Sequence, residues 1–249
     1  MNKVAKPTIV VATDKDHAAL CTADLIHQAV SENSSAVLGL ATGGTPVGVY
    51  RLLVERFQAG DLDFSDLTTF NLDEYVGLAP EHDQSYRYFM QQQLFDHVNV
   101  NRERTHVPNG LATDIEIHVA EYEKQILQAG GIDLQLLGIG NNGHIAFNEP
   151  GSAIDSRTRQ VDLTDDTIEA NSRFFNSAAD VPRHAITMGI GTILEARRIV
   201  LMATGESKAK VVQAAIEGPA APRNPASLLQ GHVGLTFVLD PASAHLLRI

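Results

Sequence analysis

The sequence predicts an α/β fold with a mostly parallel sheet. Short apolar runs, typical of buried strands, alternate along the chain with longer segments of helical periodicity. Two of the runs are followed directly by glycine-rich turns, which are typical of the end of a strand. At 249 residues with 44% hydrophobic content, the chain can bury one sizeable core, so we expect residues 1–249 to form a single domain.

The expected strands follow one another at intervals that leave room for a helix between them. In chain order they are residues 8–12, 36–41, 67–72, 134–139, 185–188, 199–203 and 235–239. Residues 151–182 have weaker periodicity and many polar side chains, so we expect an excursion that forms a lid over the strand ends.

Two of the expected helices carry clear start signals. Thr45 and Pro46 begin one of them, with proline at the first helical position. Thr113 and Glu116 have the spacing of a capping box, which predicts a helix that ends before the glycine pair at 130–131.

Composition excludes several classes of partner. The net charge of -11 disfavours nucleic acid and anionic membranes, because both bind basic surfaces. No apolar stretch approaches a membrane span, and Lys3 and Lys6 lead into the first strand rather than a signal peptide, so we expect a cytoplasmic protein. Cys21 is the single cysteine, which excludes a disulfide framework and a thiolate metal site; we expect it to be a small core residue.

The turn Gly43-Gly44-Thr45 lies between a buried strand and a helix. Glycines let backbone amides approach a ligand closely, and the amino end of a helix presents unpaired N–H groups, so this turn is a candidate phosphate site. Arg173 and Lys208 are candidate cationic partners for a phosphate in this acidic chain. The alternatives are an ordinary tight turn and two surface charges.

Two acids stand at the end of the strand expected at 67–72. Side chains alternate across a strand, so Asp73 and Glu74 should point apart, and one of them can face a ligand. Asp73 aligned with the ligand would be a general base. The alternative is a solvated acid or a helix cap.

Residues 137–150 hold an amide, an imidazole and a carboxylate just past another buried strand. These are Asn142, His144 and Glu149. In open parallel sheets, ligands bind at the carboxyl ends of the strands. Histidine takes and gives protons near neutral pH, and a nearby carboxylate orients its ring, so we expect this segment to be catalytic.

The same segment contains the pattern Gly138-x-Gly140-x-x-Gly143, which on its own indicates dinucleotide binding. We reject that interpretation because Pro150 and Gly151 stop any helix soon after the third glycine. The other histidines lack metal-ligand spacing, so no metal site is expected.

In these motifs the chain resembles the glucosamine-6-phosphate deaminase family, also called glucosamine-6-phosphate isomerase. The resemblance implies a Rossmann-like open sheet with helices on both faces. It also implies conversion of glucosamine 6-phosphate to fructose 6-phosphate and ammonia in amino sugar catabolism, without a cofactor. The matching segments are 40–46 (LATGGTP), 70–78 (FNLDEYVGL), 85–90 (SYRYFM), 138–150 (GIGNNGHIAFNEP) and 171–175 (NSRFF).

The resemblance also implies roles for individual residues. His144 would open the pyranose ring, with Glu149 and Asn142 helping to hold and charge it. Asp73 would then move a proton from the carbon that bears the amine to the neighbouring carbonyl carbon. The phosphate would be held by Gly43, Gly44, Thr45, Arg173 and Lys208.

The chain departs from the family pattern at two places. Some members have aspartate where this chain has Asn142; an amide cannot share a proton, so ring opening should rest on His144 and Glu149. Members activated by the N-acetylated sugar phosphate have lysine at the position of Val161 and a longer carboxyl-terminal tail, whereas this chain keeps Arg159 and stops at position 249. We therefore do not expect that regulation; a homo-oligomer is compatible with the sequence but not established by it.

Two other functions compete with this one. The first is 6-phosphogluconolactonase, which shares a similar glycine-histidine loop but whose lactone hydrolysis needs no enolising base such as Asp73. The second is a sugar-phosphate sensor of a transcription regulator, for which the sequence leaves no room for a DNA-binding helix-turn-helix.

Overall fold

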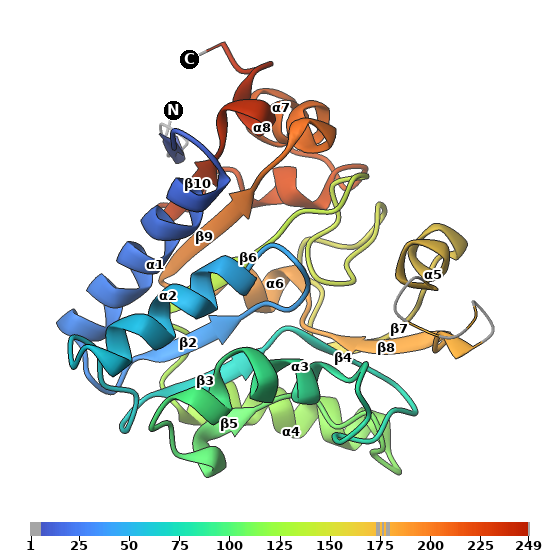
Figure 1. Cartoon of the computed structure of the whole chain (residues 1–249). Coiled ribbons are helices and arrows are strands. Elements are labelled where there is room, and N and C mark those ends of the chain that lie inside the picture. Colours follow the sequence, from blue (N-terminus) through green and yellow to red (C-terminus); the bar gives the residue numbers. More distant parts are fainter. Residues whose placement is uncertain (1–5, 173–174, 176, 178–179, 249) are drawn as a thin grey trace.

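The main sheet of the protein is parallel throughout. The computed structural model describes residues 6–172, 175, 177 and 180–248, without the side chains of Asp166, Ala170 and Asn171. Within this part of the chain the strand order is β1-β10-β9-β6-β2-β3-β5 (Figure 1). The strands are β1 Thr8–Val11, β2 Val37–Leu40, β3 Thr68–Asn71, β5 Thr105–His106, β6 Leu134–Leu137, β9 Arg198–Ala203 and β10 Leu235–Leu239.

The strand order reverses direction between β2 and β6. From β2 the chain proceeds to β3 and β5 on one side; it then returns to β6, on the other side of β2, and continues to β9 and β10. Loops that leave the carboxyl ends of two such neighbours diverge and leave a crevice, which is where open α/β sheets bind ligands. The loops that follow β2 and β6 contain residues 41–46 and 138–149.

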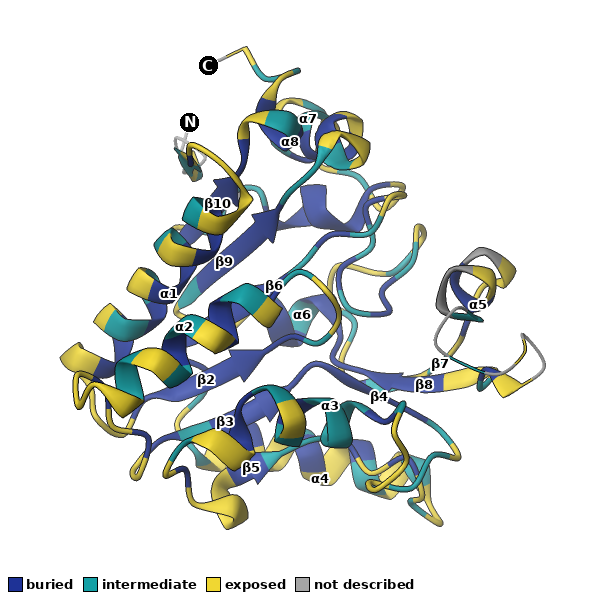
Figure 2. Ribbon diagram, viewed as in Figure 1, coloured by how far each residue is buried: buried dark blue, intermediate teal, exposed yellow. Residues whose placement is uncertain are grey.

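Helices cover both faces of this sheet, with α1 and α2 on one face and α4 and α6 on the other (Figure 1). The central strands β2 and β6 are buried along their whole length, as strands covered on both faces must be, while the outer sides of the helices are exposed (Figure 2). The helices are α1 Lys15–Glu32, α2 Val47–Gln58, α3 Tyr86–Gln93, α4 Ile115–Gln128, α5 Asp165–Ser172, α6 Ile190–Leu194, α7 Ala209–Glu217 and α8 Pro241–Ala244.

A second, smaller sheet begins just past the carboxyl end of β3. Its strands are β4 Asp73–Tyr75, β8 His184–Thr187 and β7 Arg159–Asp162, which pair antiparallel in the order β4-β8-β7. The prediction of a mostly parallel α/β sheet is confirmed, but the run expected at 185–188 lies in this smaller sheet. A hydrophobic cluster separate from the main core combines Tyr75 and Ala185 of this sheet with Phe147 of the loop after β6.

The two helix starts expected from the sequence each lie one residue further along the chain. The cap of α4 is Asp114, whose side chain accepts a hydrogen bond from the Ile117 amide, so the capping box with Thr113 is wrong. Helix α2 begins after Pro46, and no side chain caps its first turn. Cys21, on α1, is partly buried against the core as expected. None of the helices in the described ranges is long and apolar enough to cross a membrane.

We predict that Gly189→Ala destabilises the fold. Gly189 precedes α6, and a Cβ there would lie 2.1 Å from the Ser156 carbonyl oxygen, so backbone would have to move. Overpacking of this kind costs roughly 1–3 kcal/mol, which urea unfolding measures. Gly44→Ala, where a Cβ would meet no atom within 4 Å, is the matched control. Equal stability of the two variants would contradict the packing seen between Gly189 and the 155–157 segment.

Candidate active site

The loops after β2 and β6 lie side by side at the switch point. The hydroxyl oxygen of Thr45 is 3.9 Å from the position that a Cβ of Gly138 would occupy. The Tyr50 hydroxyl, in the first turn of α2, donates a 2.5 Å hydrogen bond to the Ala41 carbonyl and fixes the start of the loop after β2. Residues far apart in the chain therefore surround one end of the sheet, as the sequence predicts.

The glycine turn presents free amides. Among the described residues, the backbone N–H groups of Gly43, Gly44 and Thr45 donate to no protein atom. Gly43 has φ +94°, and a Cβ at Gly43 or Gly44 would meet nothing within 4 Å, so the turn borders open space. The absence of a side-chain cap on α2 leaves its first amides available as well, which is the arrangement that binds anions at helix amino termini.

Lys208 brings a cation to this end of the sheet. It lies in a short 3₁₀ turn after β9, and its Nζ donates a 2.7 Å hydrogen bond to Oδ1 of Asn141, in the loop after β6. Burial lowers the pKa of Lys208, because the charged form loses contact with water. Arg173, the other cation that the sequence predicts here, lies outside the described residues.

Asp73 is a carboxyl group with little access to water. It is 6% exposed, and no described residue donates a hydrogen bond to its side chain. Burial, and secondarily the charge of Glu74, raise the pKa of Asp73 to about 8. An acid with such a pKa is a stronger base than an ordinary carboxylate once it is ionised, and about a tenth of it is ionised at pH 7.

Glu74, the neighbouring acid, stabilises the start of α3. Its carboxylate accepts hydrogen bonds from the backbone amides of Tyr75 at 2.9 Å, Tyr86 at 2.9 Å and Arg87 at 3.0 Å. Two of these donors lie in the first turn of α3, so Glu74 caps that helix across the chain. The helix cap is therefore Glu74 and not Asp73, which is buried and accepts no hydrogen bond from a described residue.

The loop after β6 holds His144 in a restricted position. The loop folds back on itself, since Gly140 N donates to the His144 carbonyl at 2.9 Å. The imidazole lies against Gly140, where a Cβ would be 2.2 Å from the ring. Ala146 has a φ of +51°, an uncommon conformation for a residue with a side chain, which points to local strain in the turn.

Glu149 faces this imidazole. Its Oε1 is 3.4 Å from His144 Nδ1 and accepts a 2.7 Å hydrogen bond from the Thr167 hydroxyl, while Oε2 accepts a 2.7 Å bond from Asn142 Nδ2. Partial burial would raise the pKa of Glu149, but the contacts with His144, Thr167 and Asn142 outweigh it and lower that pKa to about 2. Glu149 is therefore a permanently ionised partner for the imidazole.

The smaller sheet joins Asp73 to the histidine loop. Asp73 pairs with Thr187 in the β4–β8 register, and the Thr187 hydroxyl accepts a 3.1 Å hydrogen bond from the Phe147 amide. One residue on, Met188 donates to the Leu72 carbonyl at 2.6 Å and accepts from the Asn148 side chain at 2.8 Å. Both candidate catalytic segments are thus attached to the same two residues of the chain.

Several contributors to the site are not apparent in the sequence. Thr167, Asn141 and Thr187 hydrogen-bond to predicted residues or to their loop, yet each is a common polar residue outside any motif. Of the three, only Asn141 could have been identified from the sequence, because it lies in the glycine-rich segment beside Asn142. The other two come from elements whose contacts with the site depend on the three-dimensional fold.

A cavity of about 370 Å³ lies elsewhere, between α4 and α6. Its lining includes Gly131 and Ile132, which precede β6, so it is at the opposite end of the strands from the candidate site. Across the described ranges, no cluster of three or more histidine, cysteine or acidic side chains is arranged to hold a metal ion.

The fold is that of α/β enzymes whose ligands bind at the carboxyl ends of parallel strands, and the candidate site lies at these ends. Within that class, the chain belongs to the family of glucosamine-6-phosphate isomerases and 6-phosphogluconolactonases, whose model matches residues 15–238.

Relatives and solved structures agree with this membership. A glucosamine-6-phosphate deaminase of Rhodopirellula baltica is 57% identical over 239 residues, covering 96% of this chain and 95% of the relative. One of Clostridium perfringens is 49% identical over 240 residues, with 96% and 99% covered. The solved structure of a monomeric glucosamine-6-phosphate deaminase superposes with a TM-score of 0.94 at 42% identity, covering 96% of this chain and all of that one. A 6-phosphogluconolactonase of Trypanosoma brucei, at 21% identity and TM-score 0.79, shares the fold over 98% of this chain and 99% of its own.

We predict that Asp73→Asn stabilises the protein at high pH. A carboxyl whose folded pKa of about 8 exceeds its ordinary value of 3.8 favours folding below pH 4, and that contribution is lost as the pH rises to 8. Asparagine resembles the protonated acid and cannot ionise. The stability advantage of the variant should therefore grow between pH 4 and pH 8, by about 2 kcal/mol or more.

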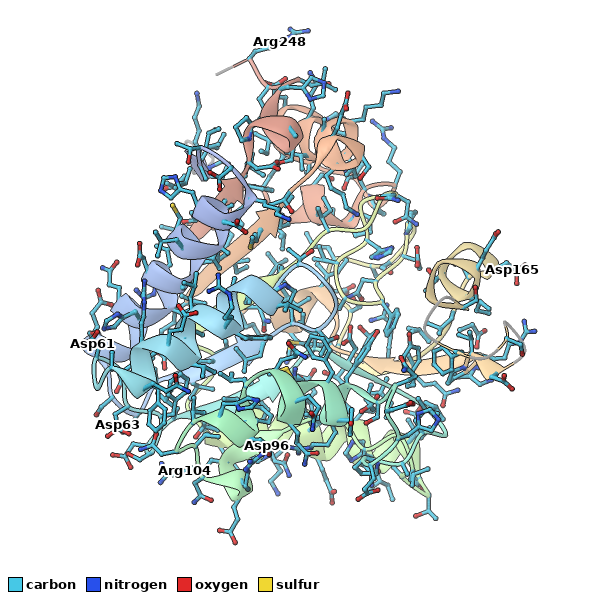
Figure 3. All side chains as sticks on the ribbon, in the orientation of Figure 1. Asp61, Asp63, Asp96, Arg104, Asp165 and Arg248 are labelled. Atoms are coloured by element: carbon cyan, nitrogen blue, oxygen red, sulfur yellow. The ribbon has the colours of Figure 1, made fainter. Side chains whose placement is uncertain are left out.

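Urea unfolding of both proteins across this pH range measures the effect. Asp61→Asn, at an exposed position, is the control and should leave the pH dependence as it is in the natural chain (Figure 3). A difference between Asp73→Asn and the natural chain that is constant with pH would show that Asp73 is not kept protonated by its surroundings.

Proposed function

We propose that this chain is a glucosamine-6-phosphate deaminase, which converts glucosamine 6-phosphate and water to fructose 6-phosphate and ammonia. The observation that carries the proposal is the buried Asp73, attached through Thr187 to the loop that holds His144 and Glu149. An isomerisation of this kind needs a base beside a carbon atom and a proton shuttle beside the ring oxygen. Relatives that carry this name match 96% of the chain at 46–57% identity.

Ring opening is the first step and belongs to the imidazole. His144 gives a proton to the ring oxygen and accepts one from the anomeric hydroxyl, so the pyranose opens to the aldehyde. Glu149, ionised because its pKa is about 2, stabilises the charged imidazole from 3.4 Å. Asn142 contributes an amide hydrogen bond to that carboxylate and takes no part in proton transfer.

Isomerisation is the second step and belongs to Asp73. Its carboxylate takes the proton from the carbon that bears the amine and returns it to the former aldehyde carbon. The product is an imine at the second carbon, which water hydrolyses to the ketone and ammonia. A base with a pKa of about 8 suits this task, because catalysis is most efficient when the pKa of the base lies near the working pH.

The phosphate is held at the start of α2. The free amides of Gly43, Gly44 and Thr45 accommodate its oxygens, and Lys208 supplies charge. We include Arg173 in this set on the basis of the sequence motif. Such local donors are necessary, because the net charge of -11 repels an anionic substrate from the protein as a whole.

We further propose that residues 1–249 act as one catalytic domain in cytoplasmic amino sugar catabolism, and that residues 151–182 cover the bound sugar. The support for a lid is the position of α5, beyond the loops that follow β2 and β6 (Figure 1), and its hydrogen bond to Glu149. A cover that excludes water would strengthen every charge interaction beneath it.

Release of ammonia tests the proposed activity. Purified protein mixed with glucosamine 6-phosphate alone should release ammonia, which a coupled glutamate dehydrogenase assay measures. Asp73→Asn should lower turnover by about 10²–10⁴, the usual loss when a general base is removed, with the Michaelis constant little changed. Acid production from 6-phosphogluconolactone with no ammonia from the amino sugar would assign the chain to the lactonases instead.

We predict that Lys208→Ala weakens substrate binding rather than chemistry. Loss of a charged hydrogen bond to the phosphate should raise the Michaelis constant about 10- to 100-fold, most strongly at low salt. Lys210→Ala, two residues along at an exposed position, is the control and should leave the constant as it is. Equal constants for Lys208→Ala and the natural protein would remove Lys208 from the phosphate site.

A further inference from the structure

Thr167 is placed by the fold against a predicted catalytic group. It lies in the first turn of α5, is 7% exposed, and donates a 2.7 Å hydrogen bond to Oε1 of Glu149, which is 18 positions earlier in the chain. This oxygen is also the one that faces His144. The Thr167 hydroxyl and the candidate catalytic imidazole therefore both lie next to Oε1 of Glu149.

The direction of this hydrogen bond is fixed by a second threonine. The Thr164 hydroxyl donates to the Thr167 oxygen at 3.0 Å and also accepts from the Thr167 amide at 3.2 Å. Since the Thr167 oxygen is already an acceptor, its own hydrogen is free to point to Glu149. Chains of hydrogen bonds in which each donor polarises the next are stronger than isolated ones.

The Glu149 carboxylate is consequently held at both ends. Asn142 donates to Oε2 from the same loop, whereas Thr167 donates to Oε1 from a different element. A carboxylate held at one oxygen only can rotate, which would change the distance from Oε1 to His144. Among the described residues, the groups that act on this carboxyl are His144 and Asn142 from its own loop and Thr167 from α5, while Arg159 of β7 contacts the adjacent Asn148 at 3.0 Å.

We propose that Thr167 is a positioning residue for the histidine-carboxylate pair, and that its hydroxyl couples the docking of α5 to the orientation of Glu149. The expected effect on kcat rests on the proposed deaminase function, whereas the positioning of Glu149 by Thr167 does not. When α5 is docked, Oε1 of Glu149 is directed to His144. When the hydroxyl is removed, Oε1 loses its anchor, and ring opening slows although the sugar and its phosphate still bind.

The test compares Thr167→Val with Thr167→Ser. Valine keeps the shape of threonine without the hydroxyl, and serine keeps the hydroxyl. For Thr167→Val we expect kcat to fall about 10- to 100-fold, the effect of losing a hydrogen bond to a charged group, with KM changed by less than about threefold. Thr167→Ser should recover most of the activity. Thr167→Ala is a second variant without the hydroxyl, in case valine disturbs α5, and circular dichroism checks that each variant folds.

A second measurement needs no substrate. Titration of the Glu149 carboxyl by ¹³C NMR should show its pKa rising in Thr167→Val, because the ionised form loses a donor, and returning in Thr167→Ser. Unchanged kcat and unchanged titration would overturn the proposal, as would a loss confined to KM. If the natural protein released no ammonia but the titration still shifted, the deaminase function would fail while the coupling between Thr167 and Glu149 stood.

Discussion

The passage of the chain from one sheet to the other between Asn71 and Asp73 determines the rest of the site. Strand β3 ends at Asn71 and β4 begins at Asp73, so a single residue separates two buried strands in different sheets. The Met188 amide holds that residue through the Leu72 carbonyl. Asp73 is buried at this junction, and without a donor beside it the ionised form is costly. The chemistry we assign to Asp73 is a consequence of this position.

The other two acids, Glu74 and Glu149, have the hydrogen-bond donors that Asp73 lacks. Glu74 is also buried, and burial raises its pKa, but three backbone amides donate hydrogen bonds to its carboxylate, whereas no described residue donates one to Asp73. Glu149 resembles Glu74 in being well supplied with donors, and it remains ionised beside His144. Pairs of acids whose surroundings separate their pKa values are typical of sites that run acid and base chemistry together. Such sites are retained for function at some expense of stability.

The parallel sheet and most of the proposed site could be predicted from the sequence because their signals are local. Apolar runs, glycine turns and the residues just past strand ends are all visible without a fold. The antiparallel sheet was not predicted, since β4 follows β3 almost without a break and β7 lies in a polar segment. Two contacts join separate elements of the chain: Glu74 caps α3, and Thr167 donates to Glu149. No local sequence pattern predicts such contacts.

The central claim is that an acid and an imidazole from different loops meet over one sugar whose phosphate lies at the start of α2. A crystal structure with the open-chain amino-alditol 6-phosphate, which cannot isomerise, tests it most directly. The account requires the phosphate within hydrogen-bonding distance of the amides of Gly43, Gly44 and Thr45, and the amine-bearing carbon beside the Asp73 carboxylate. A phosphate bound elsewhere, or a sugar chain that reaches His144 but leaves Asp73 without contact, would contradict it.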